Sequence, residues 1–118
     1  MAKIKLNSSI DSFYLDIFSL LNDTFLELRP KEVEVLAALY TKNYNLIPKI
    51  KDEKSRMTIL FSSDSKKELA ESLNLGYNSF MNNITALRKK QFIVNNMLNK
   101  KFYFNPKSTK IEIEICII

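Results

Sequence analysis

The chain has no histidine, no tryptophan, one glycine and one cysteine in 118 residues. Without histidine and with a single thiol, it offers no disulfide, no Cys/His zinc site and no catalytic scheme that needs an imidazole. It has no glycine-rich phosphate loop, and the acidic pair Asp52 and Glu53 falls in a charged stretch with no sign of a cleft. We therefore expect a protein that is not an enzyme, with no cofactor and no bound metal.

Long apolar runs and a signal-peptide pattern are also missing from the sequence. We therefore expect no membrane segment and a cytoplasmic location, in a bacterial host cell. With 46% hydrophobic and 26% charged residues, a chain of this length can form one domain with its own core. Cys116 is expected to be a small buried hydrophobe and not a nucleophile, because no base or nearby cation activates it.

The net charge is +5, and the positive excess is concentrated in one part of the chain. Residues 63–110 hold nine Lys/Arg and three Asp/Glu, whereas residues 1–62 hold nine and eight. This concentration favours a polyanionic partner, although a solvated lysine face would have the same composition. Twelve asparagines beside many lysines and isoleucines suggest a low-GC coding sequence, and hence a phage or another mobile element.

Hydrophobic spacing predicts two helices in the first half of the chain. Residues 1–9 are expected to form an arm or short strand, and a helix over 10–22 follows, with Ser8 or Ser9 as its N-cap. The β-favouring residues of that segment leave a strand as the alternative. A proline at a helix start predicts the next helix over 31–42. Residues 43–56 are expected to be a solvated polar connection, and residues 57–61 a short strand.

The second half has the most regular pattern. A helix is expected over 66–73, with Ser65 as its N-cap and Glu68 at capping-box spacing from it. A turn with Gly76 then leads to a helix over 78–90. The apolar side chains of this last helix share one face, on which they can pack against the helix before it. After Phe92 the period changes, and residues 93–96 and 101–105 are predicted to form a β-hairpin.

This order of helix, turn, helix and hairpin resembles the winged helix-turn-helix families of bacterial and phage regulators and replication initiators. The residues that carry the resemblance are Leu69, Ala70, Leu73, Asn74, Leu75, Phe80, Ile84, Leu87, residues 89–93 and, at the end of the wing, residues 104–106. The departure is Gln91, which stands where a glycine commonly ends the recognition helix and so needs a left-handed or altered backbone there.

The resemblance implies an α+β fold with a three-helix core and a small antiparallel β-hairpin wing over residues 31–106. An N-terminal arm and helix over 1–30 and a C-terminal strand over 107–118 complete the expected single domain. The final strand alternates apolar and acidic residues, so it needs a sheet partner. It can extend the wing, pair with an N-terminal strand or build a homodimer, and residues 10–22 are a second candidate dimer surface.

The winged-helix resemblance implies binding of double-stranded DNA. The outward face of the 78–90 helix has no acid to repel a phosphate backbone, and its predicted base-reading residues are Asn78, Ser79, Asn82 and Thr85. Predicted phosphate contacts are Lys66, Lys67, Tyr77, Arg88, Lys89, Lys90, Lys100 and Lys101. Tyr77 can equally cover the core edge. Met97 and Leu98 are placed at the wing tip, where folding back onto the domain is favoured over insertion into a minor groove.

Two functions from different classes fit these expectations. The first is a phage or mobile-element transcriptional regulator or replication-initiation protein that binds DNA. The second is a non-enzymatic structural or adaptor protein of a phage assembly, associated with the virion, that uses the winged helix for protein contacts. The salt dependence of DNA binding separates the two, because neutralised phosphates release counterions.

Overall fold

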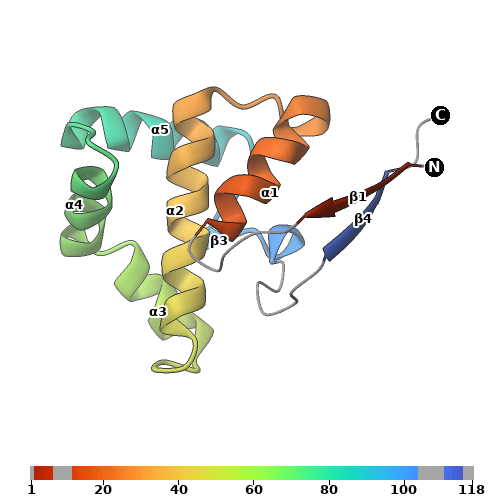
Figure 1. Ribbon diagram of the computed structural model, residues 1–118. Helices are drawn as coiled ribbons and strands as arrows, with labels where there is room; N and C mark the ends of the chain where they lie inside the picture. The colour runs from red at the N-terminus through yellow and green to blue at the C-terminus, as the bar shows by residue number, and fades with distance from the viewer. Residues whose placement is uncertain (1, 7–11, 104–110, 116–118) are drawn as a thin grey trace.

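The computed structural model describes residues 2–6, 12–103 and 111–115 of an α+β protein, a helical body with two separate two-stranded antiparallel sheets (Figure 1). The helical elements are α1 (Phe13–Leu21), the π-helical turn η1 (Asn22–Leu26), α2 (Pro30–Leu46), α3 (Glu53–Leu60), α4 (Ser63–Ser72), α5 (Tyr77–Lys89) and the 3-10 turn η2 (Lys100–Phe102). The strands are β1 (Ala2–Leu6), β2 (Ile93–Val94), β3 (Met97–Leu98) and β4 (Ile111–Ile115).

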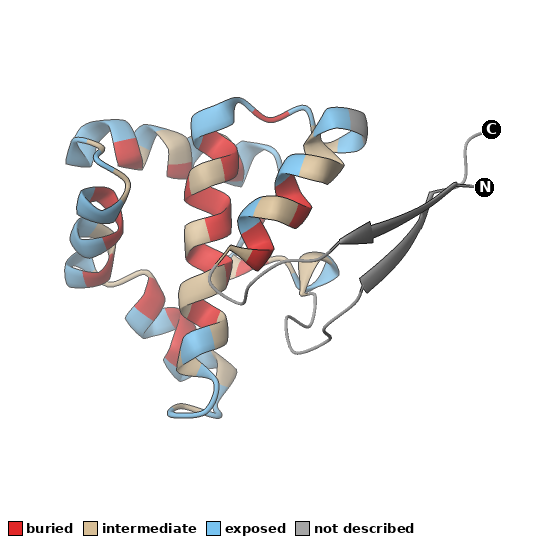
Figure 2. Cartoon of the chain, in the orientation of Figure 1, coloured by how far each residue is buried: buried red, intermediate tan, exposed pale blue. Residues whose placement is uncertain are grey.

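Helix α2 runs through the middle of the helical body, and buried residues follow its length (Figure 2). It begins at Pro30, where a missing amide hydrogen costs no intrahelical bond, and the backbone N–H of Arg29 donates to Glu32 Oε1 at 3.0 Å. The predicted helix over 31–42 is confirmed, but α2 continues to Leu46. Its fully buried residues, Leu36, Leu39 and Tyr40 among them, pack against α1 and α5.

Helix α1 confirms the helix predicted over 10–22 and excludes the strand alternative. Ser12 stands at its N-cap, and the Ser12 hydroxyl donates to Asp16 Oδ2 at 3.1 Å. The predicted caps Ser8 and Ser9 lie outside the described residues. The inner face of α1 packs on α2, with the rings of Phe18 and Tyr40 5.2 Å apart, so this helix belongs to the core of its own domain.

The largest correction concerns residues 43–61, which were predicted as a solvated connection and a strand. Residues 43–46 end α2, the connection is only residues 47–52, and residues 53–60 form the helix α3. The Asp52 side chain caps α3 by accepting from the backbone N–H of Ser55 at 3.0 Å. Arg56 was expected to be solvated, yet it is 7% exposed and donates to Asn43 Oδ1 and to the carbonyl oxygens of Ile50 and Lys51. These bonds hold the connection in place and start the helix.

Helices α4 and α5 confirm the two helices predicted on either side of Gly76. The predicted capping box is wrong, because the cap of α4 is Ser62, whose hydroxyl oxygen accepts from the N–H of Ser65 at 3.3 Å. In the turn, the left-handed residue is Asn74, with φ of 55°, whereas Gly76 has φ of −63°. The turn therefore uses the tolerance of asparagine for this conformation.

The hairpin after α5 is shorter than predicted. Gln91 has φ of 70°, which confirms the expected left-handed end of the helix. Asn95 and Asn96 follow with φ of 53° and 57° and join β2 to β3, as in a two-residue type I′ turn. Met97 and Leu98 therefore form a strand and not the tip, and Leu98 is 2% exposed. The predicted second strand over 101–105 is wrong for residues 101–103, because Lys101 and Phe102 lie in η2 and Tyr103 is in no strand.

The N-terminal and C-terminal strands pair with each other. Strand β1 is antiparallel to β4, with Ala2 opposite Ile115 and Leu6 opposite Ile111. This is one of the three arrangements that the alternating C-terminal segment left open. In it, β4 pairs with a strand of the same chain. In Figure 1 this two-stranded ribbon extends away from the helices. Cys116 and residues 104–106 lie outside the described residues.

Candidate nucleic-acid interface

Helix α5 has its apolar side chains on one face, three of the four predicted base-reading residues on the opposite face, and Ser79 on the flank. Phe80, Ile84 and Leu87 are fully buried against the core, which fixes the rotation of the helix. At 100° per residue, positions 78, 82, 85 and 89 then lie on the opposite side. All four predicted base-reading residues are exposed: Asn78, Ser79, Asn82 and Thr85.

The polar groups of this outer face differ in what they can still bind. The Thr85 hydroxyl donates to the Met81 carbonyl oxygen at 3.0 Å, so its hydrogen is used within the helix and its oxygen can only accept. The side chains of Asn78, Ser79 and Asn82 make no hydrogen bond within the described ranges. An asparagine amide can donate to and accept from an adenine edge in the major groove, so these side chains are free for base contacts.

The predicted phosphate-contact residues fall into free and engaged groups. Lys67, Lys89 and Lys101 are exposed and form no ion pair with any described residue. Tyr77, at the start of α5, is 40% exposed, which leaves its side chain accessible. Lys90 is engaged internally: its Nζ lies 2.7 Å from Glu32 Oε1 and 3.2 Å from the Glu27 carbonyl oxygen.

Lys90 therefore has a structural role that the sequence did not indicate. Glu32 is 3% exposed, and its carboxylate accepts from both Lys90 and the Arg29 backbone. Burial raises the pKa of Glu32, but these hydrogen bonds and the charges of Lys90 and Arg29 outweigh it and hold the pKa below its ordinary value. Lys100 is also paired, with Glu53 at 3.2 Å, although its side chain is 70% exposed.

A hollow of about 430 Å³ brings together polar residues from three helices and the hairpin turn. We call it the basic pocket and define it by Lys54 of α3, Lys66 of α4, Arg88 of α5, and Asn95 and Asn96 of the turn. The sequence predicted Lys66 and Arg88 as phosphate contacts but gave no reason to place them together.

Lys54 was missed, because it was assigned to a solvated loop. The signal that would have found it is Asp52, an N-cap residue with Ser55 three positions later, which starts α3 and so places Lys54 in its first turn. On the helix, Lys54 lines the hollow, whereas the sequence analysis placed it in a solvated connection. The pocket is therefore a product of the helix that the sequence analysis took for a loop.

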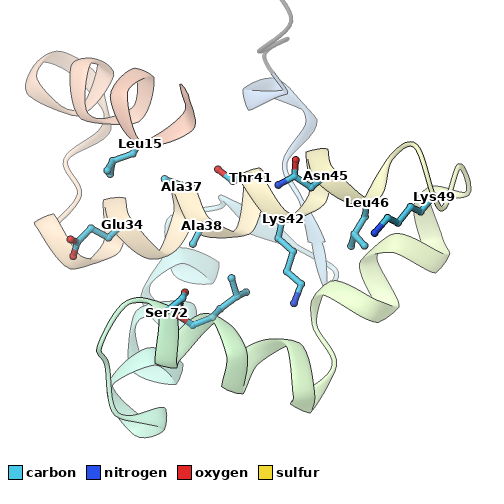
Figure 3. A pocket seen from close by; sticks show the side chains of 11 residues that line it. Leu15, Glu34, Ala37, Ala38, Thr41, Lys42, Asn45, Leu46, Lys49 and Ser72 are labelled. Atoms are coloured by element: carbon cyan, nitrogen blue, oxygen red, sulfur yellow. Dashed lines mark hydrogen bonds between the residues drawn. The ribbon is translucent and has the colours of Figure 1, made fainter. Parts of the chain in front are cut away.

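A second hollow, of about 500 Å³, lies along α2 between α1 and α4 (Figure 3). Its lining is mainly apolar, with Ala37 and Ala38 along the helix, and Lys42 at its edge pairs with Glu68 at 2.9 Å. None of the predicted base-reading or phosphate-contact residues lines it. Its exposed residues Asn45 and Lys49 therefore serve as controls for substitutions at the candidate interface.

Comparisons of the chain with models of protein families, with curated proteins and with solved structures found no match. Within the described part of the chain, no helix is long and apolar enough to cross a membrane. The same residues contain no group of three or more His, Cys, Asp or Glu side chains that could hold a metal ion. The interface is therefore interpreted from its own geometry and charge.

Proposed function

We propose that the protein binds double-stranded DNA as a winged helix-turn-helix protein, with α5 in the major groove and the β2–β3 hairpin as a short wing. The observation that carries this proposal is the exposed side of α5, where the side chains of Asn78, Ser79 and Asn82 make no hydrogen bond to any described residue. A helix with its side chains is about 10–12 Å across, which matches a major groove about 12 Å wide. No acidic residue occurs between positions 73 and 105.

Each part of this face has a distinct role in the proposal. Asn78 and Asn82 read adenine edges, Ser79 bonds a base edge or a phosphate, and Thr85 presents its methyl group to a thymine methyl. Lys67, Lys89 and Lys101, which form no ion pair with any described residue, hold phosphates without reading sequence. Lys90 is excluded from this group because Glu32 already holds it. The biological role that fits is a transcriptional regulator or a replication-initiation protein.

The direct test is binding of the purified protein to a pool of random duplexes, followed by salt titration of the best-bound sequence. The proposal predicts that affinity falls linearly on a log-log plot, with a slope of about −0.9 for each phosphate neutralised. A protein that binds no duplex at low salt would refute DNA binding. That result would favour the structural or adaptor function, in which the same surfaces contact proteins.

Asn82 is the residue whose substitution tests base reading. Asn82→Ala should reduce the preference for the selected sequence about 5- to 150-fold, because a bidentate base contact is worth about 1–3 kcal/mol. Its affinity for an unrelated duplex should change little. Asn45→Ala, another exposed asparagine on a helix, is the matched control and should change neither. Equal losses on all duplexes would instead make Asn82 a backbone contact.

A further inference from the structure

We propose that the basic pocket is a phosphate site that seats one backbone phosphate of the bound duplex; this inference rests on the proposed DNA-binding function. The pocket is a built concavity in which cations from three separate helices meet the turn of the hairpin. Convergence of this kind requires the tertiary fold, whereas scattered surface lysines arise from composition alone.

The three cations of the pocket form no ion pair with a described residue. Lys54 and Lys66 form neither an ion pair nor a side-chain hydrogen bond within the described ranges, although Lys66 is partly buried. No acidic side chain lines the hollow. Of the nearest acids in sequence, Asp52 is exposed, and its hydrogen bonds from Ser55 together with the charge of Lys54 lower its pKa. Glu53 pairs with Lys100 at 3.2 Å, and Asp64 is exposed in the first turn of α4. A bound anion would supply the missing countercharge.

Arg88 and the hairpin turn provide directed donors at the same place. One guanidinium nitrogen of Arg88, Nη2, lies 3.5 Å from Asn96 Oδ1, a long contact that orients the side chain toward the turn and leaves its other N–H groups free. The Asn95 side chain makes no hydrogen bond with any other described residue. Guanidinium and amide N–H groups suit the oxygen atoms of a phosphate, which accept several hydrogen bonds at once.

The position of the pocket fits a duplex that takes α5 in its groove. Arg88 is next to Lys89, the last residue of the outward stripe, and at 100° per residue it points to the flank of that stripe. Because the helix nearly fills the groove, the bordering phosphate backbones must pass along its flanks. The pocket is on one such flank, where the hairpin turn and α3 extend the surface beyond α5.

The salt dependence of duplex binding distinguishes one phosphate shared by the three cations from three separate phosphate contacts. Each of Lys54→Gln, Lys66→Gln and Arg88→Gln should weaken binding about tenfold or more. If the three cations hold one phosphate, the triple variant should lose only about 0.9 from the log-log slope, whereas three separate contacts would lose about 2.7. Lys49→Gln, an exposed lysine outside the pocket, is the matched control and should leave the slope unchanged.

Inorganic phosphate gives a second measurement that needs no DNA. In wild-type protein, phosphate should shift the backbone amide NMR signals of the hairpin turn at constant ionic strength, and the triple variant should lose this response. Shifts spread evenly over the exposed lysines would overturn the inference.

The outcomes for the pocket and for DNA binding can be told apart. Duplex binding with an unchanged slope in the triple variant would overturn the pocket while leaving the proposed function in place. Failure of the wild-type protein to bind any duplex refutes the proposed function, and with it the seating of a duplex phosphate.

Discussion

The ion pair between Glu32 and Lys90 joins the start of α2 to the end of α5, and its removal tests how α5 is held in place. Lys90 Nζ lies 2.7 Å from Glu32 Oε1, and the carboxylate is 3% exposed. In Glu32→Gln the amide oxygen can still accept from the Arg29 backbone, as the carboxylate does at 3.0 Å. The substitution therefore removes the negative charge that pairs with Lys90, with little change in volume.

The size of the effect follows from the exposure of the two partners. Removing one member of a fully buried pair costs about 3–5 kcal/mol, because the other charge stays buried and unpaired. Lys90 is 38% exposed and can reach water, so we expect a smaller loss for removing the carboxylate charge, about 1–2 kcal/mol. For a domain of this size we expect the Tm to fall by about 4–8 °C.

The pH dependence of the same variant gives a sharper test. Because the pKa of Glu32 in the folded protein is below its ordinary value of 4.5, the carboxylate stabilises the fold fully above that pH. The stabilisation is lost as the pH falls through the folded pKa. Denaturant unfolding at pH 7 should thus separate wild type from Glu32→Gln, and the difference should shrink below pH 4.

The control is Glu34→Gln, which breaks the exposed pair with Lys31 at 3.0 Å and should cost under about 0.5 kcal/mol. The reasoning fails if the two variants unfold alike at pH 7, or if the Glu32→Gln deficit is as large at pH 3 as at pH 7.

Two further substitutions probe the ends of α5 and the hairpin. Gln91→Gly should raise the free energy of unfolding by about 0.5–1 kcal/mol, because φ of 70° costs glycine nothing; a decrease in denaturant midpoint would contradict this. Tyr40→Phe should lower the free energy of unfolding by about 1–2 kcal/mol, since the Tyr40 hydroxyl donates to the Asn99 carbonyl oxygen from a fully buried ring. A loss under 0.3 kcal/mol in urea unfolding would show that water replaces this bond.

The sequence predicted the helix-turn-helix segment well because its apolar spacing is strict. Phe80, Ile84 and Leu87 recur with the helical period, and all three are fully buried. The expected backbone at Gln91 is confirmed for the same local reason, since a helix that ends there needs a left-handed residue whatever its side chain. Local geometry decided both features, so the sequence was sufficient for them.

The predictions failed where tertiary contacts or short segments decide the structure. Residues 57–61 are a short apolar run, which periodicity cannot assign to strand or helix. The bonds of the Arg56 side chain to Asn43 on α2 and to the carbonyl oxygens of the preceding connection favour the helix. The hairpin was predicted too long because the two asparagines at positions 95 and 96 were assigned to a strand and not to a type I′ turn.

In the candidate interface too, the features set by helical spacing were predicted, and those set by packing between helices were not. The exposed face of α5 follows from helical spacing, and its predicted residues Asn78, Ser79, Asn82 and Thr85 are accessible. The basic pocket could not be predicted, because it depends on how α3 packs against α4 and the hairpin. The engagement of Lys90 by Glu32 likewise joins residues 58 positions apart. The positive charge of Lys90 gave no sign in the sequence that it is paired, unlike Lys67, Lys89 and Lys101, which form no ion pair with any described residue.

The salt dependence of duplex affinity tests the central claim most directly. Lys67, Lys89 and Lys101, together with one phosphate in the basic pocket, predict about four phosphate contacts and a log-log slope of about −3 to −4. Fluorescence anisotropy with a labelled duplex between about 50 and 200 mM salt measures this slope. A slope near zero, or no binding at the lowest salt, would contradict the account.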